Sequence, residues 1–339
     1  MRDYVAPLAA RLAAGQCQSP APKALFAMTS SPAPLPLSLP ARNLALGNVY
    51  AMGSMLAWAA GLPAAGILIP LLPAEQLGAV RVSLAALVLL PVWFFADGLG
   101  AILRASWLRG IMVGSLLGIS SWMIIIGQGL GGAVTAAVIT ATMPIFAIAL
   151  EVLLDGRRLT RRLVLGIALS MAGGILTLDF SAGGSDMLLG VAFCCLSILC
   201  YVLGSRFTVT ALPDLSMIGR TTLTLSGAAI ASIFIALVSL ALGTPLADPG
   251  LWGGEELVAL LVFAVAGLSL AQIFWILAIR RIGIGMTSLH SNAAPFYVMI
   301  ILWLLFAAPW NWAQAAAAGL VALGVLIAQG VVPLPRALR

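Results

Sequence analysis

The sequence predicts an all-α integral membrane protein with ten transmembrane helices, arranged as two inverted repeats of five helices. Of its 339 residues, 62% are apolar and 8% are charged, and the mean hydropathy is +1.12. Soluble domains carry about 25% charged residues. The long uncharged runs can cross a bilayer ten times. One of these runs, which contains a proline, also recurs 151 positions later.

The recurring run is the clearest sign of an internal repeat. Residues 132–146 read GAVTAAVITATMPIF, and residues 284–297 read IGMTSLHSNAAPFY. Pro144 of the first stretch aligns with Pro295 of the second. We therefore expect the two stretches to be equivalent helices in two copies of one unit.

The first part of the chain differs in composition from the rest. Residues 1–42 are rich in proline, alanine and serine and lack a continuous apolar run, so we expect a disordered cytoplasmic tail. No charge occurs between Arg42 and Glu75, which predicts a first helix at 44–69, bent at Pro63.

The other helices follow from the remaining uncharged runs. The run at 110–150 is too long for one span of about 20 residues, so it should hold the third and fourth helices. We expect these two to separate at residues 127–132, GQGLGG. The other helices are expected at 76–95, 163–178, 187–205, 215–242, 257–279, 283–306 and 312–332.

An odd number of helices per copy requires the second copy to cross the membrane in the opposite direction. The two copies are expected at 43–180 and 186–333. In the 151-residue alignment Gly173 matches Gly324, and the loop charge Arg161 matches Trp312, an aromatic residue typical of a membrane interface. Inverted repeats are how many secondary transporters build two alternating states around one central site.

The positions of the basic residues predict the orientation. Short loops rich in lysine and arginine stay in the cytoplasm. With a cytoplasmic N-terminus, 15 of the 17 basic residues lie on that side, and the outward loops contain acidic but no basic residues. The chain is thus expected to be a multi-pass protein of the bacterial inner membrane with both termini in the cytoplasm.

Several functions are disfavoured. The net charge of +6 comes from basic residues beside apolar spans, the usual pattern of cytoplasmic loops, so no nucleic acid partner is expected. No GxxxxGK[ST] motif occurs, and the four cysteines have no ligand-like or disulfide-like spacing. We expect no cofactor and no metal. The expected partners are a small-molecule substrate and the lipid bilayer, for a monomer or homodimer.

The chain resembles the drug/metabolite transporter superfamily, specifically its ten-helix EamA-type exporters, over about residues 44–332. Glycine and an aromatic residue recur in the first and sixth helices, an arginine opens the second helix in GAVRVSLAALVLL, and EVLLDGRR ends the fourth. Arg157 stands where the family usually has a glutamate. The residues that carry the first pattern are Gly47, Trp58, Gly190 and Tyr201.

The resemblance implies export of small metabolites, often amino acids. We therefore expect a secondary transporter, not an enzyme, that exports small polar or amphipathic metabolites by alternating access around a central cavity. A metabolite importer or exchanger is the first alternative. A membrane-embedded enzyme acting on lipid-linked substrates is the second, but the spans contain no HExxH motif, DxxxD pair or Ser/His/Asp set.

His290, the only histidine, is a candidate substrate-binding residue with its neighbours Ser291 and Asn292. It is expected about nine residues into the ninth helix, which is about 13 Å deep at 1.5 Å per residue. An ionisable group near mid-membrane is a functional hypothesis by default, and an imidazole can exchange a proton near neutral pH. The alternative is a neutral imidazole that only bridges two helices.

The two aligned prolines are expected to kink their helices. Each removes one backbone N–H and crowds the carbonyl four residues earlier, which belongs to Thr140 or Ser291. A carbonyl left free in the membrane must be buried in protein or line a wet cavity. We expect Thr140 and Ser291 to face one cavity. A kink at Pro144 and Pro295 that serves packing alone is the alternative.

Aromatic walls with a few polar groups suit an amphipathic ligand. Trp58 and Tyr201 are expected to line the outer and inner halves of the pathway, although interfacial anchoring or core packing would explain them equally well. Trp122, Gln272 and Trp275 are further lining candidates.

Two arginines, Arg81 and Arg220, lie early in the second and seventh helices rather than in loops. Snorkelling to headgroups is the favoured interpretation, with capture of an anionic substrate or pairing with a carboxylate as the alternative. No acidic residue falls at the centre of a helix, which disfavours carboxylate-based proton antiport.

Small residues recur every four positions in the third and fifth expected helices, and such spacing lets helix backbones approach closely in lipid. We expect these residues to form packing seams. They are Gly110, Gly114 and Gly118 in the third helix, and Gly166, Ser170 and Gly174 in the fifth.

Overall fold

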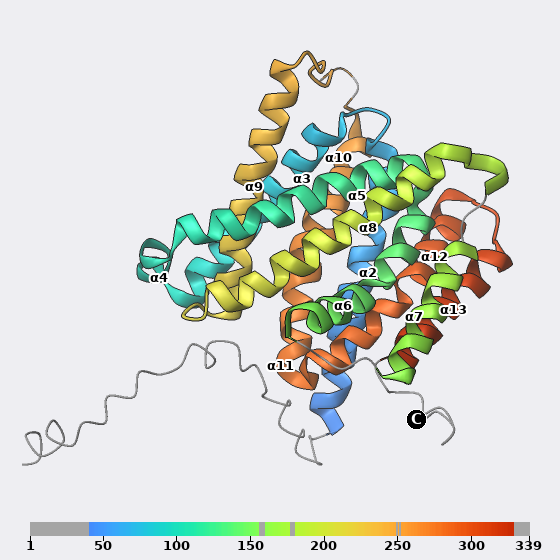
Figure 1. Cartoon of the computed structure of the whole chain (residues 1–339). Helices are drawn as coiled ribbons and strands as arrows, with labels where there is room; N and C mark the ends of the chain where they lie inside the picture. Colours follow the sequence, from blue (N-terminus) through green and yellow to red (C-terminus); the bar gives the residue numbers. More distant parts are fainter. Residues whose placement is uncertain (1–40, 156–159, 177–179, 249, 251, 329–339) are drawn as a thin grey trace, which may run out of the picture. The chain divides into compact units, whose positions relative to one another are not determined.

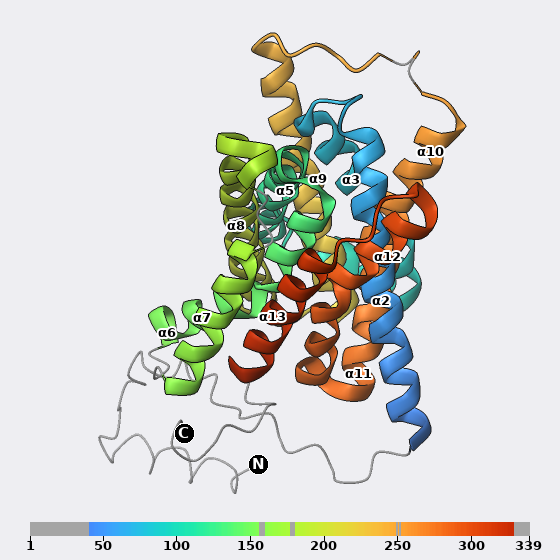
Figure 2. The ribbon, with the colours of Figure 1, turned by 90° about the vertical axis from the view of Figure 1, so that its right-hand side faces the viewer.

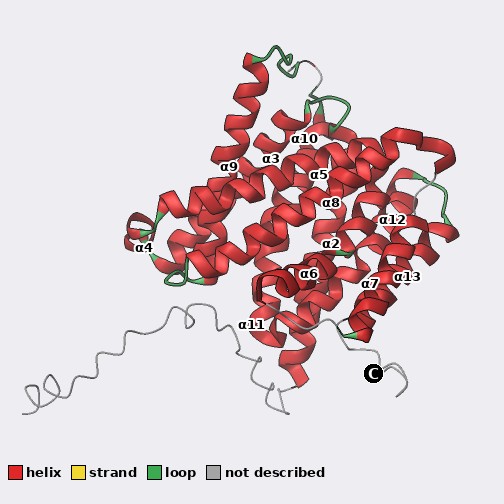
Figure 3. Ribbon diagram, in the orientation of Figure 1, coloured by secondary structure: helices red, strands yellow, loops and turns green. Residues whose placement is uncertain are grey.

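The computed structural model describes residues 41–155, 160–176, 180–248, 250 and 252–328, and this part consists of helices joined by loops (Figures 1 and 3). Within these ranges no strand occurs, which confirms the predicted all-α class. Most of the tail expected at 1–42 and the loop glycine and arginines of EVLLDGRR lie outside the described residues.

The helices follow the order expected from the apolar runs. The first half contains α2 (Ala41–Leu68), α3 (Ala74–Asp97), α4 (Leu99–Arg104), α5 (Trp107–Ala141), α6 (Met143–Asp155) and α7 (Arg161–Leu176). The second half contains α8 (Phe180–Ala211), α9 (Met217–Ala241), α10 (Gly254–Leu261), η3 (Val262–Leu270), α11 (Ala271–Leu289), η4 (His290–Ala293), α12 (Ala294–Phe306) and α13 (Trp312–Ala328).

Six of these segments are long and apolar enough to cross a bilayer. They are Leu44–Leu68, Ala74–Asp97, Trp107–Ala141, Ser185–Ala211, Met217–Ala241 and Gly254–Ile282. Shorter apolar helices occur at Met143–Leu154, His290–Phe306 and Trp312–Ile327. The protein is therefore a multi-pass membrane protein, whereas ten spans stay a prediction.

The break expected inside the long run 110–150 lies at Gly132. Its φ of +80° and ψ of +165° are non-helical and interrupt α5. Only glycine adopts this conformation without strain. A second break follows at Thr142, between α5 and α6, so the expected fourth helix is itself divided.

The expected eighth and ninth helices differ most from the prediction. The eighth contains a nine-residue π-helix, η3, between α10 and α11. The prediction of one helix at 283–306 was wrong, because α11 continues to Leu289 and η4 separates it from α12. A proline in the first turn of α12 explains this division, since proline cannot donate the backbone bond that a continuous helix needs.

The predicted glycine seam of the third helix is the contact between α5 and α9. A Cβ atom built on Gly114 would lie 2.6 Å from the backbone nitrogen of Ala228. One built on Gly118 would lie 2.8 Å from the Ala228 carbonyl oxygen, and Gly227 of α9 meets the backbone of Gly110 in the same way. The two backbones therefore touch without intervening side chains, which confirms the seam.

The seam of the fifth helix lies between α7 and α13, which pack side by side (Figure 2). A Cβ atom on Gly173 would meet Ala317 and Val321, and one on Gly324 would meet Gly166 and Ser170. The Ser170 hydroxyl also donates to the Val321 carbonyl oxygen at 3.1 Å. Residues later in α7 contact residues earlier in α13, so the two helices are antiparallel.

This contact is reciprocal under the 151-residue shift. Gly173 then corresponds to Gly324, and Gly166 corresponds to Ala317. The pair formed by residues 173 and 317 thus has its equivalent in the pair formed by 324 and 166. Such reciprocity defines an isologous contact across a twofold axis. An antiparallel contact of this kind is the one expected between two inverted copies, and the inversion itself stays a prediction.

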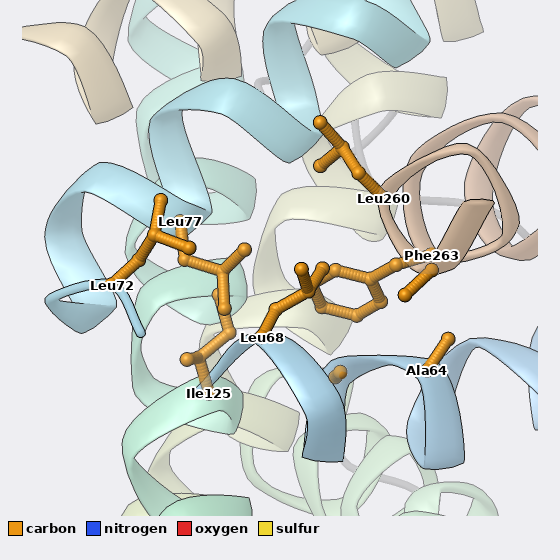
Figure 4. Packing of buried hydrophobic residues seen from close by; sticks show 9 residues of the cluster. Ala64, Leu68, Leu72, Leu77, Ile125, Leu260 and Phe263 are labelled. Atoms are coloured by element: carbon orange, nitrogen blue, oxygen red, sulfur yellow. The ribbon is translucent and has the colours of Figure 1, made fainter. Parts of the chain in front are cut away.

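A cluster of buried apolar side chains joins α2, α3, α5, α10 and η3 (Figure 4). Leu68, Leu77 and Phe263 are each 1% exposed or less, and Ile125 is 2% exposed. This cluster holds the π-helix against α2 and α3 and so fixes the position of Phe263.

Candidate functional site

Both aligned prolines lie in the first turn of a helix that follows a break. Pro144 is the second residue of α6, directly after the break at Thr142, and Pro295 is the second residue of α12, directly after η4. The structure thus places each proline where its missing N–H costs no helical bond. Thr140 lies one residue before the end of α5, and its hydroxyl donates to the Ala136 carbonyl oxygen at 2.7 Å.

The two proline segments contact the same apolar cluster. Phe296, next to Pro295, packs against a cluster that includes Val138, Ala141 and Ile145. Residues of α13 complete this cluster. The segments are therefore neighbours, as expected for equivalent stretches, but their described contact is apolar.

The residues of η4 present polar groups at the break. His290 and Ser291 are half-buried, and each makes an interaction within the protein. Asn292 is only 6% exposed, and neither its Nδ2 nor its Oδ1 atom has a hydrogen-bond partner in the protein. A buried, unpaired amide is costly, and its two atoms are chemically able to donate to and accept from a polar ligand.

The structure separates the two aromatic residues of the first and sixth expected helices. Trp58 packs beside Ala59 and Leu62 of α2, where these meet Ala137 of α5 and Val298 of α12. It therefore lies among the elements that carry both proline segments. Tyr201 is 38% exposed on α8 and is not part of this group.

The other lining candidates lie on α5 and α11. Trp122 is half-buried beside α3, and its indole Nε1 is buried without a hydrogen-bond partner. Gln272 and Trp275 are half-buried and three residues apart, so they share one face of α11. Ala271 and Phe274, which each precede one of these residues, face α2 instead. The Ala271 carbonyl oxygen accepts from Ser54 at 2.7 Å, and the Phe274 ring packs at a tilt against Tyr50, with the ring centroids 5.8 Å apart.

The sequence analysis missed Gln128, which was considered only as part of a turn. Its Nε2 atom donates to the Leu62 carbonyl oxygen at 2.6 Å, and the side chain is 4% exposed. The bond joins α5 to α2 one residue before Pro63. A lone amide inside the apolar GQGLGG stretch was the available signal.

We expect Gln128→Leu to lower the free energy of unfolding by about 1 kcal/mol, because it removes one buried hydrogen bond while keeping the side-chain volume. The measurement is the thermal unfolding midpoint of the purified protein in detergent. Gln314→Leu is the control, since that side chain is half-buried in the first turn of α13 without a described bond to another helix. Equal midpoints for both variants would contradict the prediction.

The favoured interpretation of Arg81 was wrong. This side chain is 7% exposed, and its guanidinium carbon lies 3.9 Å from the centroid of the Phe263 ring. It is therefore directed into the protein, not toward headgroups. Arg220 donates from Nε to the Leu215 carbonyl oxygen at 2.8 Å and from a terminal nitrogen to that of Pro213, so it ties down the loop before α9.

Comparisons with known proteins agree with this architecture. The model of the EamA-like transporter family matches residues 45–178 and 188–329, one match in each half of the chain. The uncharacterized transporter YyaM of Bacillus subtilis (strain 168) is 28% identical over 272 residues, which cover 76% of this chain and 84% of YyaM.

A solved crystal structure that is 21% identical superposes with a TM-score of 0.58 and covers 84% of this chain and 96% of its own. At this identity it shows the fold alone. The family and the relative both indicate a transporter rather than an enzyme. Because the family model matches both halves and most of its length, this chain belongs to the EamA-like transporter family.

Proposed function

We propose that the protein is a secondary exporter of small polar or amphipathic metabolites, such as amino acids, that works by alternating access in the bacterial inner membrane with both termini in the cytoplasm. One observation carries the mechanism. The two halves meet through an antiparallel, reciprocal contact between α7 and α13, while other equivalent helix pairs are packed differently.

The first of these equivalent pairs is α3 with η3, from the expected second and eighth helices, and it encloses Arg81 and Phe263. Its counterpart is α9 with α5, from the expected seventh and third helices, and these two meet backbone to backbone through glycines. An inverted-repeat transporter in one of its two states has such unequal packing of equivalent pairs, because exchanging the two packings produces the other state.

The proposed substrate pathway passes the elements that meet at Trp58. Asn292 supplies an unpaired amide, and His290 and Ser291 follow each other in the same short helix. Trp122, Gln272 and Trp275 provide apolar and polar surface on α5 and α11. These groups suit a small ligand with both a polar and an apolar part.

Counterflow in proteoliposomes tests the proposal. The purified protein is reconstituted and labelled amino acids, nucleosides and cationic drugs are screened, with protein of each orientation distinguished by protease access. Saturable flux with a higher apparent affinity on the cytoplasmic face is the expected result. A higher affinity on the outer face would favour an importer, and the absence of saturable flux for every compound would refute transport of these classes.

His290 gives a separate prediction. We expect His290→Ala to lower the transport rate about tenfold, the effect of losing one polar contact with the substrate in η4. The measurement is the initial rate of the best substrate. A variant with the wild-type rate would remove His290 from the mechanism.

A further inference from the structure

Arg81 is a buried cation that has no counter-ion among the residues that the structure describes. Its side chain is 7% exposed in α3, and its Nε atom is buried without a hydrogen-bond partner. In the part of the chain that the structure describes, the guanidinium has no carboxylate within ion-pair distance. It has a cation–π contact instead, in which its carbon lies 3.9 Å from the centroid of the Phe263 ring.

The Phe263 ring does not balance the burial of this charge. A desolvated cation–π contact favours the buried position of a cation by about 30-fold in its equilibrium constant. Transfer of an unpaired ion from water into the protein disfavours that position by a factor several orders of magnitude larger. The ring provides no oxygen or nitrogen acceptor, so the buried Nε–H donor of Arg81 is left for another partner.

Arg220, near the start of α9 in the other half, shows how another guanidinium of this fold is hydrogen-bonded. Arg220 directs its donors to the carbonyl oxygens of Leu215 and Pro213, in the loop before its helix. Arg81 is the eighth residue of α3, about 10 Å from the helix start at 1.5 Å per residue. It lies too far from the preceding loop to hydrogen-bond the loop carbonyl oxygens as Arg220 does.

A second unpaired donor lies on the neighbouring helix. The indole Nε1 of Trp122 is buried without a partner. The Trp122 backbone lies beside Gly78, which is one helical turn before Arg81, and a Cβ on Gly78 would be 3.8 Å from the Trp122 Cα atom. Two orphan donors on adjacent helices, one of them charged, point to an acceptor that carries negative charge.

Charge balance narrows the class of this acceptor. Among the described basic residues, Arg81 is the only one that is buried. The half-buried Arg220 and Arg281 donate to backbone carbonyl oxygens. One free positive charge balances one carboxylate, whereas a phosphate carries nearly two negative charges. A carboxylate also matches the planar fork of a guanidinium.

We propose that Arg81 binds the carboxylate of the transported substrate, with the Trp122 indole N–H as a second donor, so that the substrate must be a monocarboxylate. This assignment rests on the proposed transport function. It makes Phe263 a positioning residue, because the ring holds the guanidinium plane and η3 holds the ring.

Equilibrium binding to the purified protein tests the assignment without requiring flux. The probes are matched pairs, L-leucine with L-leucinamide and benzoate with benzamide, together with inorganic phosphate. The expected result is a rise in the thermal unfolding midpoint with the carboxylate of each pair and none with its amide. Arg81→Gln should weaken carboxylate binding by about 10-fold to 150-fold.

Further variants separate charge from geometry. Arg81→Lys keeps the charge but not the fork, and Trp122→Phe removes only the indole donor, so both should weaken binding less than Arg81→Gln does. Arg104→Gln changes an exposed arginine in α4 and should bind all probes like the wild type. If Arg81→Gln did not purify as a single species, Arg81→Lys and Trp122→Phe would decide.

The proposal is overturned if no carboxylate binds, if carboxylate and amide bind alike, if phosphate binds as well as the carboxylates, or if Arg81→Gln keeps wild-type affinity. Carboxylate binding that depends on Arg81 without any flux would refute the transport function and keep the site. Flux of neutral or cationic compounds alone, at wild-type rates in Arg81→Gln, would keep the function and refute the site.

Discussion

Replacing Gly114 by alanine is expected to lower the free energy of unfolding by about 3 kcal/mol or more, the upper range for overpacking a tight contact. The added methyl would lie 2.6 Å from the Ala228 nitrogen and 2.7 Å from the Gly227 carbonyl carbon, and it would also meet the Thr224 carbonyl oxygen. All three atoms are backbone, so no side chain can move aside. The α5 and α9 helices would have to separate.

Gly66→Ala provides the matched control for this change. Gly66 also lies in a membrane helix, α2, but nothing lies within 4 Å of a Cβ built on it. Alanine favours a helix over glycine by about 1 kcal/mol, so this variant should be as stable as the wild type or more stable. The stability of both variants is measured by thermal unfolding midpoints and size-exclusion profiles in detergent. Equal stability of the two variants would mean that α5 and α9 do not touch as described.

Replacing Asn292 by leucine should have opposite effects on stability and on transport. Both amide atoms of Asn292 are buried without hydrogen-bond partners, and each such atom costs about 1–3 kcal/mol. A leucine of similar size removes this cost, so the unfolding midpoint should rise. If the amide binds substrate, transport should fall at least tenfold in the same variant, as is common where function requires an unfavourable group.

Asn48→Leu controls for the general effect of losing an amide in a membrane helix. The Asn48 side chain donates to the Leu44 carbonyl oxygen in its own helix at 3.0 Å, so its replacement should change neither property strongly. Unfolding midpoints and initial transport rates are measured on the same preparations. An Asn292→Leu variant that transports normally would remove Asn292 from the substrate site, and one with a lower midpoint would show that its amide is paired.

Much of the fold was predictable because lipid imposes simple rules on sequence. Long uncharged runs located most helices to within a few residues, and the spacing of Gly110, Gly114 and Gly118 identified a seam before its partner helix was known. The break at GQGLGG was also predictable, since glycine there accepts a backbone conformation that other residues avoid.

The site was harder to predict, for physical reasons. A π-helix has no recognisable residue pattern, so the sequence of residues 262–270 did not predict η3. The position of Pro295 suggested a kink within one helix, whereas α11 and α12 are separate helices there and Pro295 lies in the first turn of α12. Whether Arg81 snorkels or turns inward depends on Phe263, 182 positions later in the chain, and local sequence carries no information about that contact.

The reciprocal contact of α7 with α13 has a mechanical consequence. When two inverted copies exchange conformations, every contact away from the twofold axis is replaced by its counterpart, but a contact on the axis is its own counterpart. The Gly173 and Gly324 seam can therefore stay intact throughout the proposed cycle and act as a fulcrum. Motion would then be confined to pairs such as α5 with α9 and α3 with η3. In each state one of these two pairs is closely packed and the other is more open.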